Sequence, residues 1–135
     1  MGKDTAHTRT LRRAVEALGS PEELAETLGV SPENLAAWLA GDQALPNEVY
    51  MRAQCEQVFK NLTNVLRAAG AGWNDVIKMN GYMVGINAEN VAAYREVRSG
   101  YLKAKELPAS TLVGVTSLVQ PELLLEIEVV AALGN

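Results

Sequence analysis

The sequence predicts an α+β fold in which three short helices precede a half where helices alternate with strands. Before Pro46 the residues are helix formers broken by turn signals, and nothing reads as a strand. After Pro46, β-branched runs alternate with helical patterns. Residues 122–133 alternate with a period of two, which is typical of a strand with one buried face. These observations predict two domains, residues 1–46 and 47–135.

Length and composition exclude several classes of protein. A chain of 135 residues suits one ordinary domain or two small ones. Its single cysteine excludes an internal disulfide and suits a reducing compartment. The first ten residues are polar, and no apolar run approaches the ~20 residues of a membrane span. We therefore expect a cytoplasmic protein that does not enter a membrane.

The charges are unevenly distributed, although the net charge is −4. An acidic protein has no general attraction for nucleic acid, so any such binding must be local. The basic arm at the start of the chain holds Arg9, Arg12 and Arg13, whereas residues 14–48 hold no Lys or Arg. This arm is the candidate for phosphate contacts. His7 lies in it without a second His nearby, so no metal site is predicted.

Turn signals divide the first part into helices over residues 8–18, 21–28 and 32–40. Ser20 and Ser31 are predicted N-caps, and each is followed by a proline at the first helical position. A glycine ends each helix, at positions 19, 29 and 41. The result is a compact three-helix module.

The stretch LAETLGVSPENLAAWL resembles the helix-turn-helix of phage-repressor-type regulators. In that resemblance Ala25 lets two helices cross closely and Gly29 makes the turn between them. Val30, Leu35 and Trp38 are then expected to fill the core between the helices.

The function of this module has two interpretations. Residues 32–40 would be the recognition helix, but they offer Glu33 and Asn34 and none of the usual base-reading Arg, Lys or Gln. One interpretation is a helical docking module that only keeps the fold. The other is a DNA-binding module in which Asn34 contacts bases and the arginine arm contacts phosphates.

The second half is predicted to run α-β-α-β-β. Asn47 is the expected cap of the longest helix, which Gly70 ends. A strand over 77–84, a helix from Asn87 through 102 and a strand over 112–118 follow, and a turn at 120–121 leads into the last strand. The apolar stripe of the longest helix is Cys55, Val58, Phe59, Leu62, Val65, Leu66 and Ala69. Cys55 is accordingly expected to be a core thiol rather than a nucleophile.

The last stretch, ELLLEIEVVAAL, carries the most interesting chemistry. A helix is the rival interpretation, but the preceding Pro121 and the β-branched residues favour a strand. Glu126 and Glu128 then point the same way, ~7 Å apart. They are either an acid/base pair or the polar face of an oligomer or solvent boundary. The alternating apolar face is Leu123, Leu125, Ile127, Val129, Ala131 and Leu133.

A second resemblance covers residues 54–133. The stretches QCEQVFKNLTNVLRAAGAGWNDVIKMNGYMV, VAAYREVRSGYL, LPASTLVGVTSL and LLLEIEVVAAL closely resemble the C-terminal part of the Rid/YjgF family of imine and enamine deaminases and chorismate-mutase-like domains. The resemblance implies a homotrimer with ligand clefts between subunits. It also implies a helix layer on one face of the sheet, with the other face lining the trimer interior.

The departures from that family bear on activity. Its first, strand-rich segment is missing, and the helical module stands in its place. Ser110 occupies the position of the arginine that clamps the substrate carboxylate, and a hydroxyl cannot replace that bidentate fork. Glu126 does match the glutamate that orients the hydrolytic water. An enzyme, if this is one, would be a weak 2-iminobutanoate/2-iminopropanoate deaminase-like hydrolase.

These expectations combine into one functional prediction. We expect an oligomerising Rid-like domain fused to a DNA-binding helix-turn-helix module, acting in regulation or binding, with the deaminase as the alternative. The uncovered sheet favours a homo-oligomer, trimeric in the family's arrangement or dimeric through its edges. A small carboxylate or imine is the expected ligand, and no cofactor is predicted. The expected cleft residues are Ser110, Thr111, Tyr82 and Asn80.

Overall fold

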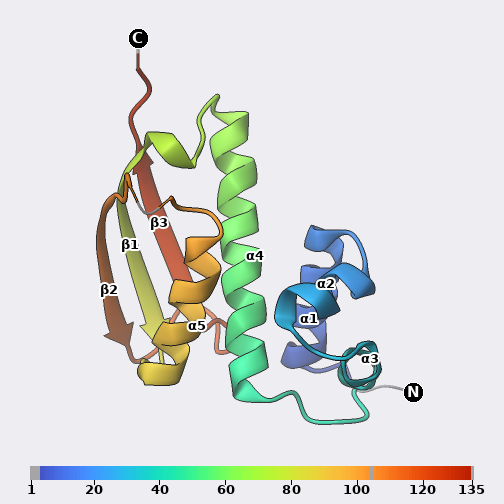
Figure 1. Ribbon diagram of the computed structural model, residues 1–135. Coiled ribbons are helices and arrows are strands. Elements are labelled where there is room, and N and C mark those ends of the chain that lie inside the picture. Colours follow the sequence, from blue (N-terminus) through green and yellow to red (C-terminus); the bar gives the residue numbers. More distant parts are fainter. Residues whose placement is uncertain (1–3, 104, 135) are drawn as a thin grey trace.

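The computed structural model describes residues 4–103 and 105–134 and has the predicted α+β architecture (Figure 1). Three short helices lie on one side of a long helix, and a three-stranded sheet lies on its other side. The elements in chain order are α1 (Ala6–Leu18), α2 (Pro21–Leu28), α3 (Pro32–Ala40), α4 (Asn47–Ala68), η1 (Trp73–Asp75), β1 (Val76–Val84), α5 (Ala88–Ser99), β2 (Ala109–Val115) and β3 (Leu125–Ala131).

The capping residues explain where the first helices begin. Ser20 and Ser31 accept hydrogen bonds from backbone N–H groups three residues on, as predicted. The first helix begins earlier than predicted because Thr5 and Thr8 form a reciprocal capping box. Thr8, expected to begin this helix, therefore lies inside its first turn.

The residues that carry the helix-turn-helix resemblance lie in the core of the module. Ala25, Leu35 and Trp38 are buried, and Val30 packs against the same cluster. Gly29 has φ +67°, a left-handed conformation that favours glycine, and ends α2. The packing roles expected of these residues are confirmed; DNA binding stays a prediction.

Helix α4 serves both halves of the protein. Its residues Tyr50 and Ala53 belong to the core of the helical module, whereas Cys55 and Phe59 belong to the core beneath the sheet. Two expectations for it were wrong. Pro46 is the N-cap, without a side-chain cap, because Asn47 is already helical. Val65 is 64% exposed although the next residue, Leu66, is buried, so Val65 lies on the side of the helix that faces away from the core.

The sheet has the order β2-β1-β3, with β1 in the centre. Strand β2 runs parallel to β1, so α5 is the crossover that parallel strands require. Strand β3 runs antiparallel to β1. The predicted strand over 112–118 was three residues too late, because pairing with β1 begins at Ala109. The helix predicted through 102 ends at Ser99, and the last strand is shorter than its alternating pattern.

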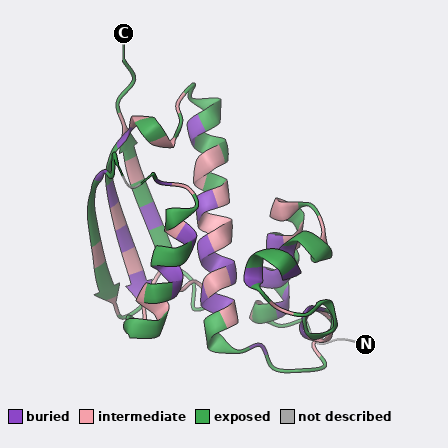
Figure 2. Cartoon of the chain, viewed as in Figure 1, coloured by how far each residue is buried: buried purple, intermediate pink, exposed green. Residues whose placement is uncertain are grey.

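One face of the sheet is covered and the other is open. Buried residues of α4, α5, β1 and β3 form one apolar cluster on the covered face, and along much of β1 and β3 buried residues alternate with more accessible ones (Figure 2). The helical module contacts α4 and does not wrap the sheet. This confirms the expected layer of two helices on a three-stranded sheet.

Candidate binding surface on the open face of the sheet

The strand register brings polar side chains from three strands together on the open face. Asn80 lies opposite Glu128 on β3 and opposite Thr111 on β2. Tyr82 lies opposite Glu126 on β3 in the same way. Successive residues of a strand point to opposite faces, and Met79 and Met83, which flank Asn80 and Tyr82 along β1, are buried under the helices. Three of the four predicted cleft residues therefore share this face.

Glu128 is the centre of this polar cluster. Its Oε1 accepts hydrogen bonds from Asn80 Nδ2 and from the Tyr82 hydroxyl, both at 3.0 Å. These two hydrogen bonds hold the pKa of Glu128 below its usual value, and the bond from Asn80 has the larger effect. The bond to Glu128 correspondingly raises the pKa of Tyr82. Glu128 is therefore suited to remain a carboxylate and to accept hydrogen bonds, not to donate a proton at neutral pH.

Glu126, the predicted catalytic residue, lies on the same face two residues before Glu128. Its side chain is exposed, and it forms no hydrogen bond or ion pair with any residue in the described ranges. It is thus free to contact a ligand or a second chain. The sequence singled out Glu126, but in the structure Glu128 is the carboxylate that hydrogen bonds hold in place. Only the pairing of the strands shows which glutamate contacts Asn80 and Tyr82.

Ser110 lies on the opposite, helix-facing side. It pairs in register with the buried Met79, and Leu112, two residues on, packs into the core beneath the helices. Ser110 and Thr111 therefore cannot line one cleft on the same face. Thr111 is exposed beside Asn80, while Ser110 approaches the hydroxyl of Tyr94 on α5.

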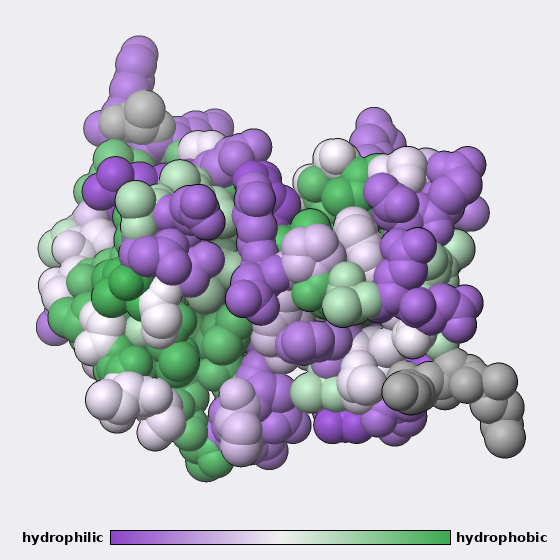
Figure 3. All heavy atoms as spheres, turned by 90° about the horizontal axis from the view of Figure 1, so that it is seen from below, coloured by the Kyte–Doolittle hydropathy of each residue, from purple (hydrophilic) through white to green (hydrophobic). Residues whose placement is uncertain are grey.

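Apolar side chains flank the polar cluster. Val113 of β2 and Val130 of β3 are 40% and 53% exposed. All the large hydrophobic residues that are exposed in the described ranges belong to the second half of the chain. Seen from below, hydrophobic residues likewise gather over the half with the sheet, and the helical module is mostly hydrophilic (Figure 3). The exposed large hydrophobic residues are Val65, Ile77, Ile86, Leu107, Val113, Val119, Val130 and Leu133.

The predicted nucleic-acid contacts lie on the surface of the helical module. Arg9 and Arg12 of α1 form ion pairs with Asp4 at 3.5 and 2.9 Å, and Arg13 is exposed beside them. Asn34 is exposed in the first turn of α3, where its backbone N–H donates to Ser31. The pairing with Asp4 partly offsets the arginine charge, a feature that the sequence did not reveal.

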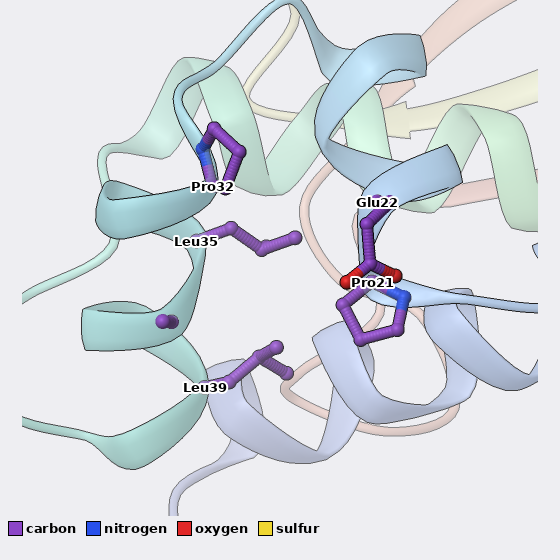
Figure 4. Close-up of a pocket in the computed structure, with 6 residues that line it drawn as sticks. Pro21, Glu22, Pro32, Leu35 and Leu39 are labelled. Carbon is purple, nitrogen blue, oxygen red and sulfur yellow. The ribbon is translucent and has the colours of Figure 1, made fainter.

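A pocket of about 340 Å³ lies between the start of α2 and one side of α3. Leu35 and Leu39 of α3 point across it toward Pro21 and Glu22 of α2 (Figure 4). Its lining is apolar apart from the Glu22 carboxylate, which would repel a phosphate. This pocket is therefore suited to an apolar contact and not to the DNA backbone.

Two further expectations concern Cys55 and metals. The Cys55 thiol is fully buried, and burial raises its pKa to about 12, so it is the core thiol predicted. Within residues 4–103 and 105–134, no three His, Cys, Asp or Glu side chains are grouped as a metal would require. No helix in those ranges is long and apolar enough to cross a membrane.

Known proteins resemble about three fifths of the chain. A RutC family protein of Synechocystis is 34% identical over 62% of this chain and 62% of its own length. AldR of Lactococcus lactis, whose name proposes that it is a regulator, is 35% identical over 60% of this chain and 61% of its own. This chain thus spans about three fifths of the length of these curated relatives.

Solved structures agree with the sequence relatives. The Rid-family protein YyfB of Yersinia pestis has 41% identity and a TM-score of 0.56, covering 61% of this chain and 62% of that one. RidA of an Antarctic Psychrobacter has 33% identity and a TM-score of 0.55, over 61% and 63%. The sequence also matches the family described as Endoribonuclease L-PSP over residues 30–133. The chain therefore belongs to this family, which is the Rid/YjgF family of the sequence resemblance.

Proposed function

We propose that the protein is a DNA-binding regulator whose Rid-type half forms a homo-oligomer through the open face of the sheet. The carrying observation is the position of the helical module. It packs on α4, away from the open face, so both the sheet and the exposed residues of α1 and α3 are free for partners. The name of AldR supports a regulatory role for a relative of the second half.

The open face supports self-association. Val113 and Val130 expose apolar surface on either side of the Glu128 cluster. The sheet's outer strands β2 and β3 each have one unpaired edge. Apolar surface and free strand edges are the features by which chains associate. A trimer is favoured by the family resemblance, and a dimer through strand edges is the other arrangement.

The arginines of α1 support contact with DNA. Arg9, Arg12 and Arg13 recur at helical spacing, so they project from one side of α1. Guanidinium groups bind phosphate through paired hydrogen bonds. An oligomer would repeat this cluster and raise its avidity. Asn34 is the candidate base contact because an amide can pair with adenine in the major groove.

A titration with mixed-sequence duplex DNA at two salt concentrations tests this proposal. Binding should weaken as salt rises, and each arginine replaced by Gln should lower the slope of log K against log salt by about 1. Asp4→Asn should tighten binding, because it frees Arg9 and Arg12. Arg67→Gln, at an exposed arginine of α4, controls for net charge. Absence of binding at low salt would refute DNA contact.

Light scattering coupled to size-exclusion chromatography tests the oligomer separately. Val113→Lys and Val130→Lys should each shift the mass toward the monomer, because they place charge in the proposed interface. Val65→Lys, on exposed α4 surface outside the sheet, should leave the mass unchanged. A wild-type monomer at micromolar concentration would contradict the proposal.

Imine or enamine deamination is the second candidate function. The observation in its favour is that Glu126 is exposed beside the Tyr82–Glu128 pair and forms no hydrogen bond with the residues that the structure describes. Ammonia release from a system that generates 2-aminoacrylate should fall in Glu126→Gln if this carboxylate orients water. Equal rates for the two proteins would remove deamination by Glu126.

A further inference from the structure

A second cavity, of about 240 Å³, lies on the covered side of the protein, between α5 and the segment that leads into β2. Its lining combines charge with apolar surface: Arg95, Arg98, Ser99, Leu102 and Leu107. Leu102 is buried and Leu107 is 55% exposed, so the apolar part runs from the interior to the surface. None of these residues belongs to the open face of the sheet or to the helical module.

The two arginines of this cavity have no acidic partner among the residues that the structure describes. They are three residues apart on α5, so they lie on the same side of the helix. Within the described ranges neither forms an ion pair, and Glu96, which lies between them in sequence, is paired with Arg52 at 2.8 Å. The Nε of Arg98 is buried and has no hydrogen-bond partner in the described part of the chain. An unpaired buried guanidinium N–H is a costly feature that a bound anion would relieve.

Tyr94 adds a second unsatisfied group one turn before Arg98. Tyr94 is only 2% exposed, and its buried hydroxyl has no hydrogen-bond partner among residues 4–103 and 105–134. Ser110 approaches this hydroxyl, but not in a geometry that completes a bond. Two buried polar groups thus lie unsatisfied on neighbouring turns of α5. The Tyr94 hydroxyl lies near Gly81 of the sheet and does not line the cavity, so the unsatisfied group that a ligand there could reach is that of Arg98.

We propose that this cavity binds a small aliphatic carboxylate. The carboxylate would accept paired hydrogen bonds from Arg98, with the charge of Arg95 alongside. Its short apolar chain would lie against Leu102 and Leu107. This lining favours a carboxylate over inorganic phosphate, which has no apolar part to bury. The proposal stands on the helix-layer geometry alone and does not depend on the function proposed above.

Amide NMR titration of the intact protein with hexanoate tests the proposal. Saturable shifts should appear in α5 and around Leu107, with a Kd on the order of 1 mM for so small a ligand. Hexanol, which lacks the charge, and inorganic phosphate, which lacks the chain, should each bind about tenfold more weakly or not at all. Phosphate binding more tightly than hexanoate would overturn the assignment.

Three variants separate binding from folding. Arg98→Gln should weaken hexanoate binding by about tenfold or more, and Arg98→Lys, which keeps the charge but loses the fork, should lie between it and the wild type. Leu107→Glu should abolish binding, because the new carboxylate repels the carboxylate of hexanoate. Leu107 is exposed, so this substitution should not affect folding. Arg67→Gln should bind as the wild type does. Unchanged affinity in Arg98→Gln or Leu107→Glu would overturn the proposal.

Discussion

The side-chain amide of Gln54 bonds twice to the short segment that leads into β3, once on each side of Leu123. Its Nε2 donates to the Glu122 carbonyl at 2.6 Å, and its Oε1 accepts from the Leu124 N–H at 2.7 Å. Leu124 in turn packs against both apolar clusters, and its carbonyl accepts from Val84 N–H at the end of β1. One polar residue of α4 therefore holds the point where the two halves of the protein meet.

Replacing Gln54 with Leu should destabilise the fold by about 2–3 kcal/mol. Gln54 is 5% exposed, so the variant loses both bonds and leaves the Leu124 N–H without its partner, while the Glu122 carbonyl keeps the bond from the Tyr50 hydroxyl. Urea unfolding followed by circular dichroism measures the change. Gln57→Leu, at a half-buried glutamine of the same helix, should change stability by no more than about 0.5 kcal/mol. Equal effects of the two variants would contradict the bracing role.

Removing the Tyr50 hydroxyl should weaken the joint between the helical module and the sheet. This hydroxyl donates to the Glu122 carbonyl and accepts from Thr10 Oγ1 of α1 at 3.5 Å. Tyr50→Phe should cost about 1–2 kcal/mol of unfolding free energy. In a double-mutant cycle with Thr10→Val the two losses should be less than additive, because both remove the same contact. Fully additive losses would show that the module and the sheet are not coupled here.

Glu128 should titrate below an ordinary glutamate. Hydrogen bonds from Asn80 and Tyr82 lower its folded-state pKa, so its stabilising contribution is present above the unfolded pKa and is lost as the pH falls through the folded one. Carboxyl ¹³C NMR should show the pKa rising in Asn80→Ala and in Tyr82→Phe. Asn64→Ala, at an exposed asparagine of α4, should leave it unchanged. An unmoved pKa in both cluster variants would disprove the hydrogen-bonded arrangement.

Tyr82 should titrate in the opposite sense. Its pKa is raised, chiefly by the hydrogen bond to Glu128. The stability that this bond contributes is therefore present below the unfolded-state pKa of Tyr82 and is lost as the pH rises through its folded-state pKa. Ultraviolet difference titration of Glu128→Gln should show the tyrosinate of Tyr82 forming at lower pH than in the wild type. The same curve in both proteins would mean that the hydroxyl does not reach Glu128.

Cys55 should resist thiol reagents in the folded protein. Burial raises its pKa to about 12, so at pH 8 very little thiolate is present, and α4 packed on the sheet excludes the reagent. Labelling by a disulfide reagent should be about a hundredfold slower or more than in urea, where the same thiol is exposed. Rapid labelling without denaturant would show that α4 separates readily from the sheet.

Local sequence patterns were sufficient to predict most of the helices and strands. Serine caps, prolines at first helical positions and closing glycines act within four residues, so α2 and α3 agree with prediction at both ends. Strand ends were less accurate, because β2 begins where β1 offers it hydrogen bonds rather than where its own residues change character. The separation of Ser110 from Thr111 follows from the same register.

The candidate sites needed contacts that no local pattern contains. Glu128 lies 48 residues from Asn80 and 46 from Tyr82 along the chain, and Arg98, Tyr94 and Gln54 showed no motif at all. A polar residue within an apolar stretch of helix, as at Gln54, was the only signal available.

The amino-acid order alone determined the helices, the existence of three strands and the family of the second half, because capping, periodicity and motif residues act over short spans. Only the tertiary structure decided which glutamate is held by hydrogen bonds, which face of the sheet Ser110 lies on and which polar groups are left unsatisfied. These three features depend on strand register and on packing between segments that are far apart in the chain.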